Sequence, residues 1–141
     1  MFIVNVEGAI RKDDKWVIVE RSRKEEHAGG GLSLVGGKVE AENTPNILEK
    51  TLKREIAEEI GITIKDEMKY IHSITFTTDQ GIIVVDVIFL CEYESGELEV
   101  KELDEVESIH LMSTEEIIEH PTIPDFVKGY IQMAEKALSV V

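Results

Sequence analysis

Three glutamates near the middle of the chain have the spacing that chemistry at a metal ion requires. Glu55, Glu58 and Glu59 stand at positions i, i+3 and i+4, so a helix would gather their carboxylates on one side. Like charges at this spacing repel by about 0.2–0.5 kcal/mol per pair. Glu58 and Glu59 also precede Gly61, in the last helical turn, where the helix dipole disfavours carboxylates. A divalent cation removes this repulsion, because Mg²⁺ and Mn²⁺ prefer clustered hard oxygen ligands.

The alternative interpretation of the three glutamates is an ordinary acidic helix face in solvent. A helical projection argues against it, because Glu55 and Glu59 fall beside the apolar residues Leu52 and Ile56. Two of the carboxylates therefore lie at the edge of the buried face rather than opposite it. A metal site is the simpler explanation of that position.

The helix that must carry these glutamates has clear end signals. Thr44 can cap it, Pro45 suits its first position, and Gly61 ends it in a left-handed conformation. Its apolar residues recur at helical spacing. They are Ile47, Leu48, Leu52, Ile56 and Ile60.

The rest of the chain alternates strand patterns with turns and ends in helices. Strands are predicted at 2–10, 16–20, 32–35, 70–77, 82–93 and 106–112, with a hairpin turn at 79–81. Glycine-rich loops flank the short strand 32–35 within 27–37. Ser113 and Glu116 form a capping box, and a last helix covers about 124–138. This order predicts an α/β (α+β) fold, one domain over 1–141 with a mixed sheet packed between helices.

Composition and charge narrow the class of function. Hydrophobic residues make up 43% of the chain and charged residues 31%, as in a globular domain. The net charge of −14 repels nucleic acid and anionic lipid, so neither is an expected partner. It also repels polyphosphate, so cations must stand between this surface and any phosphate substrate. The lone Cys91 excludes an internal disulfide, and with no signal peptide or membrane-length apolar segment we expect a cytoplasmic protein.

The glutamate run resembles a known family motif. Arg54-Glu55-Ile56-Ala57-Glu58-Glu59-Ile60-Gly61-Ile62 matches every fixed position in the second half of the Nudix box of the MutT-like Nudix hydrolases. Upstream, Gly36-Gly37-Lys38-Val39-Glu40 resembles the Gly-Gly-x-x-Glu that opens that box. The segment 104–112 resembles the family's late acidic turn and strand, so the resemblance covers most of the chain. It implies a Nudix-type α/β/α sandwich.

The first half of the box departs from the family pattern. Asn43 stands where the box has its first glutamate, and the nearest candidate, Glu42, is separated from Arg54 by eleven residues instead of seven. Val35 and Leu32 replace the usual proline and tryptophan. The departures leave the roles of Glu40 and Glu42 open.

The resemblance implies a Mg²⁺ or Mn²⁺ site and a set of roles. The metal ligands would be Glu55, Glu58, Glu59, Glu105 and the backbone carbonyl of Gly36. Catalysis would rest on Glu58, on Glu105 as a further ligand or general base, and on Arg54, which would orient the glutamates by hydrogen bonds. An ordinary salt bridge from Arg54 to Glu58 would use the same atoms.

Other polar and aromatic residues are weaker candidates. Arg21, Arg23 and Lys38 are candidate phosphate contacts, although basic residues at strand ends are usually just solvated. Four aromatic residues could stack on a base, although aromatic residues in strands more often belong to the core. They are Trp16, Tyr70, Phe76 and Phe89.

Other catalytic motifs fail on detail. A phosphate-binding P-loop would need glycine at Leu32 and Ser or Thr at Val39. The run 31–35 lacks the last glycine of a nucleophile elbow, and the four histidines show no zinc spacing. Cys91, inside an apolar strand, is most simply a core thiol.

Two classes of function remain. The first is a hydrolase that releases a nucleoside monophosphate from a nucleotide; the second is a Nudix-fold sensor that binds nucleotides without cleaving them. Sensors are expected to lose helix carboxylates, and this chain keeps all three, which favours the hydrolase. Nudix members specialised for ADP-ribose or NADH carry proline-containing signatures downstream of the box. This chain has no proline between Ile62 and His120, so the resemblance argues against both substrates. We therefore expect a small-molecule substrate, a nucleoside triphosphate or modified nucleotide, and leave a homodimer open.

Overall fold

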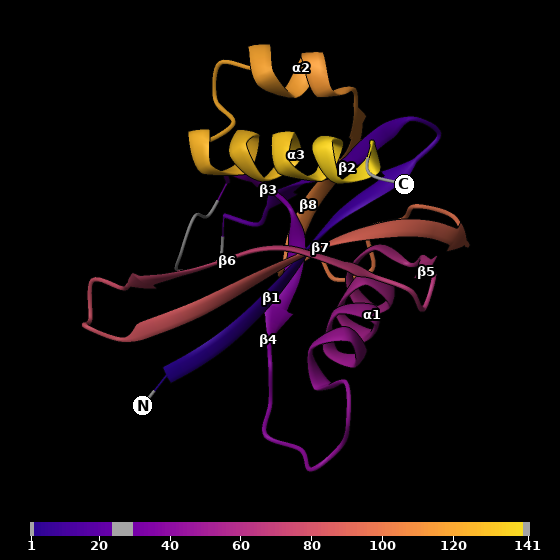
Figure 1. The fold of residues 1–141 in the computed structure, drawn as a ribbon. Helices are drawn as coiled ribbons and strands as arrows, with labels where there is room; N and C mark the ends of the chain where they lie inside the picture. The colour runs from indigo at the N-terminus through magenta and orange to yellow at the C-terminus, as the bar shows by residue number, and fades with distance from the viewer. Residues whose placement is uncertain (1, 24–29, 140–141) are drawn as a thin grey trace.

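The computed structural model describes residues 2–23 and 30–139 and contains eight strands and three helices within them. Figure 1 shows their arrangement. They are β1 (Phe2–Lys12), β2 (Lys15–Arg21), β3 (Leu32–Ser33), β4 (Val35–Lys38), α1 (Ile47–Ile60), β5 (Thr63–Ile64), β6 (Lys69–Thr77), β7 (Ile83–Ser95), β8 (Val106–Met112), α2 (Thr114–Glu119) and α3 (Asp125–Leu138).

The strands form one mixed sheet, as predicted. At its centre β1 runs parallel to β7, from Phe2 beside Ile83 to Arg11 beside Glu92. Strand β6 pairs antiparallel with β7, and β4 pairs antiparallel with β1. Strand β2 leaves β1 through a tight turn and pairs with both β3 and β8. The β2–β8 pairing brings the end of β2 beside the start of β8.

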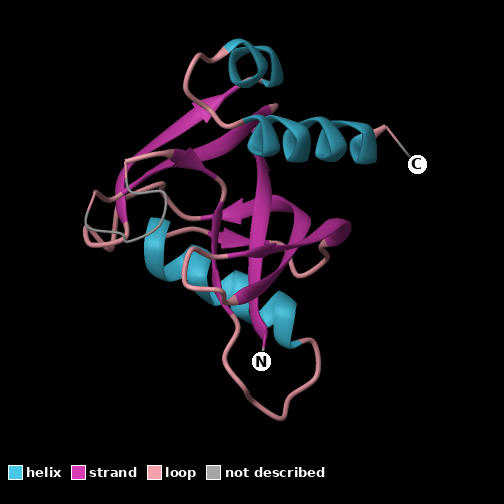
Figure 2. Ribbon diagram, turned by 90° about the vertical axis from the view of Figure 1, so that its left-hand side faces the viewer, coloured by secondary structure: helices cyan, strands magenta, loops and turns pink. Residues whose placement is uncertain are grey.

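Helices cover the sheet on two sides, so the predicted sandwich is confirmed. Helix α1 buries Leu52, Ile56 and Ile60 in a core shared with β1 and β7. Helix α3 buries Val127 and Ile131 in a second core on the other side. Figure 2 shows α1 and α3 separated by the strands.

The start of α1 differs from the prediction. The helix begins at Ile47, not directly after Thr44, because Asn46 adopts a left-handed conformation with φ of 57°. Pro45 therefore precedes the helix, and the Thr44 hydroxyl does not cap it; it accepts a 2.6 Å hydrogen bond from Lys50 Nζ. The predicted end is confirmed, since Gly61 has φ of 77° and its N–H donates to the carbonyl of Ala57 at 3.1 Å.

The glycine-rich segment also differs in part. Gly36 and Gly37 lie in β4 rather than in a loop, paired with Glu7 and Val6 of β1. A Cβ atom on Gly36 would overlap the carbonyl oxygen of Val6, so only glycine permits this close pairing. The part of the predicted loop at 27–29 lies outside the described residues.

Most of the remaining predictions are confirmed. The β6–β7 hairpin, β8, the capping box at Ser113 and the last helix all lie where the sequence indicates. The short strand β5 was not predicted. Cys91 is fully buried in the α1-side core, and this burial raises the pKa of its thiol to about 12.

Candidate metal centre

Glu59 is the buried member of the glutamate triplet. Its exposed fraction is 1%, and it lies in the last turn of α1. Arg21, at the end of β2, donates from Nη1 to Glu59 Oε1 at 3.2 Å and from Nη2 to Glu105 Oε2 at 3.2 Å. The β2–β8 pairing holds Glu105 there, because the backbone N–H of Ser22 donates to the Glu105 carbonyl at 2.9 Å. One arginine thus joins the helix to the late acidic turn.

Glu55 lies against the glycine backbone of β4. A Cβ atom placed on Gly37 would come within 2.5 Å of the Glu55 carboxyl carbon. The absence of a side chain at Gly37 therefore leaves the space that the Glu55 carboxylate fills. Of the three helix glutamates, Glu55 is thus the one that lies beside the Gly36-Gly37 backbone.

Glu58, in the last turn of α1, has a half-exposed side chain. Arg54 donates from Nη1 to Glu55 Oε1 at 3.1 Å and to Glu58 Oε2 at 3.2 Å. Its guanidinium spans the two carboxylates, a contact that is expected both of an orienting residue and of an ordinary helix salt bridge. Desolvation lowers the pKa of Arg54, but the charges of Glu55 and Glu58 outweigh it and raise that pKa overall.

The second carboxylate oxygen of Glu59 has no donor. Glu59 Oε2 is buried, and no hydrogen-bond donor reaches it. Burial, and then the interaction with the neighbouring Glu55 carboxyl, raise the pKa of Glu59 to about 8, although the charge of Arg21 lowers it. An ionised carboxylate oxygen without a partner is costly to bury. The site therefore gains from either a proton or a cation.

The donor set fits a hard divalent cation. It consists of carboxylates from Glu55, Glu58, Glu59 and Glu105 and a backbone that glycine keeps open. In the present conformation no three His, Cys, Asp or Glu side chains within residues 2–23 and 30–139 are grouped closely enough to hold an ion. Arg21 contacts Glu59 and Glu105, and Arg54 contacts Glu55 and Glu58. A cation would be favoured beside Glu59 Oε2, which has no hydrogen-bond donor.

Comparison with known proteins decides the family. The family model of the NUDIX domain matches residues 1–135 of the 141. The chain belongs to the Nudix family. It is therefore a Nudix phosphoanhydride hydrolase, a pyrophosphohydrolase of nucleoside-diphosphate-linked compounds. Nudix hydrolases generally use divalent metal cations.

Solved Nudix structures share the fold. The MutT NUDIX hydrolase of Burkholderia pseudomallei is 22% identical with a TM-score of 0.79, covering 94% of this chain and 98% of its own. The MutT protein of Methanosarcina mazei Go1 is 20% identical at 0.79, covering 98% and 96%. The NUDIX domain of Shewanella oneidensis NrtR, solved with ADP ribose, is 16% identical at 0.77, covering 99% and 90%. A comparison with curated protein sequences finds no match.

The other predicted residues of the Nudix site lie further apart. Arg23 and Lys38 are exposed, at the ends of β2 and β4. Glu40 and Glu42 are exposed on the loop that leads into the start of α1, whereas Glu58 and Glu59 stand in its last turn. Figure 1 shows this loop at the bottom of the molecule. Of the three predicted phosphate contacts, only Arg21 touches the glutamate cluster.

The sequence analysis missed a second acidic pair. Asp86 of β7 is buried and accepts a 3.1 Å hydrogen bond from Asn5 Nδ2 of β1. Burial, and then a hydrogen bond with Asp86, raise the pKa of Glu7. The apolar stretches of β1 and β7 are interrupted by the polar residues Asn5, Glu7 and Asp86. This pattern could have identified the acidic pair from the sequence. Glu7 pairs with Gly36 in the sheet, so this pair borders the Nudix site.

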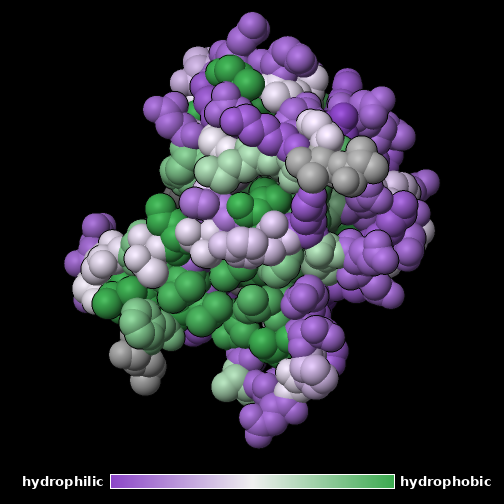
Figure 3. Space-filling model, in the orientation of Figure 1, coloured by the Kyte–Doolittle hydropathy of each residue, from purple (hydrophilic) through white to green (hydrophobic). Residues whose placement is uncertain are grey.

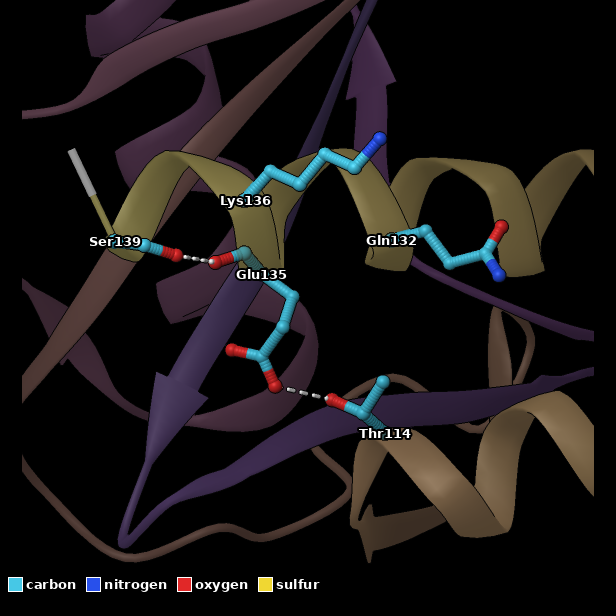
Figure 4. A pocket seen from close by; sticks show the side chains of 5 residues that line it. All are labelled: Thr114, Gln132, Glu135, Lys136 and Ser139. Carbon is cyan, nitrogen blue, oxygen red and sulfur yellow. Dashed lines mark hydrogen bonds between the residues drawn. The ribbon is translucent and has the colours of Figure 1, made fainter.

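A hollow beside α3 is separate from the glutamate cluster. Figure 4 shows it lined by Thr114, Gln132, Glu135, Lys136 and Ser139. Its polar groups serve the fold, because Trp16 Nε1 donates to Thr114 Oγ1 at 2.9 Å and Thr114 Oγ1 donates to Glu135 Oε1 at 2.8 Å. The indole of the buried Trp16 is satisfied in this way.

The four aromatic candidates divide into two pairs. Trp16 and Phe89 are buried, as core residues should be. Tyr70 and Phe76 of β6 are exposed instead. Both lie on β6, which pairs with β7. No helix of the described residues is long and apolar enough to cross a membrane.

Proposed function

We propose that this Nudix hydrolase is a Mg²⁺- or Mn²⁺-dependent pyrophosphohydrolase that converts a nucleoside triphosphate or a modified nucleotide to the nucleoside monophosphate. The observation that supports the metal requirement is the buried Glu59 carboxylate oxygen without a donor. A proton on that oxygen would neutralise the carboxylate, whereas a cation would give the oxygen a partner and leave the carboxylate charged.

Five residues would hold the metal. They are Glu55, Glu58, Glu59, Glu105 and, through its backbone carbonyl, Gly36. Bound there, the cation would neutralise the phosphates and lower the pKa of the attacking water. Arg54 would keep Glu55 and Glu58 oriented by the contacts that it already makes.

Two carboxylates of the cluster can accept the proton of the attacking water. The side chains of Glu58 and Glu105 are 48% and 43% exposed, so water reaches both. Glu59 is closed to solvent and suits a ligand better than a base. Either Glu58 or Glu105 serves as the general base, because both side chains are within reach of water.

Arg21 is the proposed phosphate contact nearest the reaction. Its guanidinium already lies between Glu59 and Glu105, so a phosphate drawn to this cluster meets its donors. Arg23 and Lys38 would act further out, as charge near the entering phosphates. Because the chain carries a net charge of −14, these few cations need the metal beside them.

The substrate class is a nucleotide with a phosphoanhydride bond. The NrtR domain, a structural neighbour, binds ADP ribose, a compound of this chemical class. The absence of proline between Ile62 and His120 favours a nucleoside triphosphate or modified nucleotide over ADP-ribose and NADH. We further propose a cytoplasmic location, because the single buried thiol of Cys91 suits a reducing compartment.

A substrate panel tests this function. Nucleoside triphosphates, modified nucleotides, ADP-ribose and NADH are incubated with the protein and Mg²⁺, and phosphate is measured with and without added pyrophosphatase. We expect phosphate from a triphosphate only when pyrophosphatase is present, because the direct product is pyrophosphate. Binding of nucleotides with no hydrolysis of any compound would favour a nucleotide sensor instead.

A further inference from the structure

Arg21 lies between two of the residues that are proposed to hold the metal. Its Nη1 atom is 3.2 Å from Glu59 Oε1, and its Nη2 atom is 3.2 Å from Glu105 Oε2. The two carboxylates come from α1 and from the turn before β8, so the guanidinium joins segments that are far apart in the sequence. The Arg21 side chain is only 16% exposed, so these contacts differ from a solvated surface ion pair.

The backbones of these three residues are fixed by hydrogen bonds. The N–H of Arg21 donates to the carbonyl of Gly31 at 2.8 Å, and the N–H of Lys101 donates to the carbonyl of Glu59 at 2.9 Å. The pairing of β2 with β8 holds the backbone of Glu105. A rearrangement of this cluster is therefore a rotation of side chains, without a change in the fold.

The guanidinium of Arg21 occupies the space between the two carboxylates. A cation held by both Glu59 and Glu105 would have to lie in that space, where one guanidinium nitrogen now contacts an oxygen of each. In this arrangement no three His, Cys, Asp or Glu side chains of the described ranges 2–23 and 30–139 are grouped closely enough to hold an ion. Glu59 and Glu105 can share a cation only if Arg21 leaves them.

Arg21 compensates the buried carboxylate of Glu59 only in part. Oε1 has the guanidinium as its partner, whereas Oε2 is buried and has no hydrogen-bond donor. The hydrophilic residues at the top and right of Figure 3 lie on the surface, and the buried charged residues of the described chain are two acids, Glu59 and Asp86. A divalent cation carries twice the charge of a guanidinium and accepts several oxygen ligands, so it can take the place of Arg21.

We propose that Arg21 is an internal counter-cation, which holds Glu59 and Glu105 in the metal-free chain and leaves both carboxylates when a divalent cation binds. This inference rests on the metal site of the proposed function. The guanidinium donors that the two carboxylates now engage would then be available to the phosphates of a substrate. Arg21 thereby couples phosphate binding to metal binding, because its donors are released only when the metal site is filled.

Calorimetric titration of the full chain with Mg²⁺ tests this exchange. The titration is made at pH 9, where protons compete little for Glu59 because its pKa is about 8. Arg21→Met removes the competing cation and should bind Mg²⁺ at least about tenfold more tightly than the natural chain. Arg21→Lys keeps the charge but lacks the planar fork that spans two carboxylates, so its affinity should rise at least about threefold.

Arg11→Met is the matched control for the loss of an arginine. Arg11 also contacts two carboxylates, those of Asp14 and of Glu135 on α3, and its side chain is 22% exposed. These partners do not belong to the glutamate cluster. The affinity of Arg11→Met for Mg²⁺ should therefore stay within about twofold of the natural value.

Thermal unfolding at the same pH separates exchange from a purely structural role. In chelator, Arg21→Met leaves two carboxylates without the guanidinium, so its Tm should fall at least about 4 °C below that of the natural chain. In saturating Mg²⁺ the difference should shrink to less than half, because Arg21 no longer contacts those carboxylates in the natural chain. An arginine that only supports the fold would cost the same stability in both conditions.

The outcomes distinguish this inference from the proposed function. If neither the natural chain nor the two Arg21 variants bind Mg²⁺, the proposed metal site is wrong and the exchange is wrong with it. If the natural chain binds Mg²⁺ and neither variant binds it more tightly, the metal site stands and the exchange is overturned. Equal losses of Tm from Arg21→Met in chelator and in Mg²⁺ would overturn it as well.

Discussion

The carboxylate of Glu55 occupies the space in which a side chain of Gly37 would stand. A Cβ atom at Gly37 would lie 2.5 Å from the Glu55 carboxyl carbon and 2.7 Å from its Oε2 atom. The second glycine of the Gly-Gly pair is thus explained by a contact with Glu55 of α1, eighteen positions later in the chain. The first glycine, Gly36, is explained by the backbone of β1.

Substitution of Gly37 should therefore affect catalysis more than stability. In Gly37→Ala the new methyl group displaces the end of the Glu55 side chain, which can rotate away at a cost of about 1 kcal/mol. The displaced carboxylate no longer meets the other ligands, so we expect the hydrolysis rate to fall at least roughly 10²-fold. Rates and urea denaturation of the same preparation measure the two effects.

Two other glycines serve as controls for this variant. Gly36→Ala forces its methyl group against backbone atoms of Val6 and Glu7 and should cost at least about 2 kcal/mol of unfolding free energy. Gly129→Ala lies in α3 with no atom near the new methyl group, and should stabilise the helix by about 0.5–1 kcal/mol. A Gly37→Ala enzyme with the natural rate would show that the position of Glu55 does not matter.

The helix glutamates should be required individually. Glu58→Gln and Glu59→Gln should each lower the rate at least roughly 10²-fold while the chain remains folded, because each removes a charged ligand. Glu49→Gln, in the first turn of the same helix, should leave the rate within about two-fold. Circular dichroism checks the fold, and equal losses from all three variants would point to a general charge effect.

Glu105 should matter far more than Glu107. Glu105 shares Arg21 with Glu59, whereas Glu107 lies exposed on β8. We expect Glu105→Gln to reduce turnover at least about 30-fold and Glu107→Gln to reduce it less than two-fold. Steady-state kinetics at saturating Mg²⁺ compares them, and mild losses from both would mean that the late acidic residue belongs elsewhere.

The metal-free protein should lose stability as pH rises because of Glu59. The pKa of Glu59 is about 8 in the fold, above its ordinary value of 4.5. Between these two values the folded chain holds a proton that the unfolded chain releases, so the unfolding free energy falls with rising pH. Relative to the natural chain, Glu59→Gln should gain on the order of 2–4 kcal/mol between pH 5 and pH 8.

Chemical denaturation with chelator present, at both pH values, measures this difference. At pH 5 Glu59 is nearly neutral in the folded natural chain, so the two folded proteins are compared with matched charge at this position. A pH dependence that is the same in the two proteins would show that Glu59 does not titrate with a raised pKa.

Local sequence patterns predicted the parts of the site that lie on one helix. Glu59 is buried because it projects beside Leu52 and Ile56, and the helical spacing alone gives that projection. Arg54 contacts Glu55 and Glu58 for the same reason, since all three lie within one turn. Gly61 ends the helix where its conformational freedom indicates.

Contacts between distant segments could not be predicted in this way. Arg21 reaches Glu59 and Glu105 only because β2 pairs with β8, and that register is set by the whole sheet. The pairing of Gly36 with Glu7 depends likewise on the placement of β4 beside β1. The start of α1 was misplaced because nothing local distinguishes a left-handed Asn46 from an ordinary loop residue.

Hydrolysis in ¹⁸O-labelled water tests the central claim most directly. The preferred nucleotide of the substrate panel is hydrolysed with Mg²⁺, and the products are separated and weighed by mass spectrometry. Attack of water on phosphorus should place one ¹⁸O atom on a single phosphorylated product, the nucleoside monophosphate or the pyrophosphate, and none on the ribose. Excess chelator should abolish the reaction. Label in the sugar, or full turnover in chelator, would contradict a metal-dependent phosphoanhydride hydrolase built on Glu55, Glu58, Glu59 and Glu105.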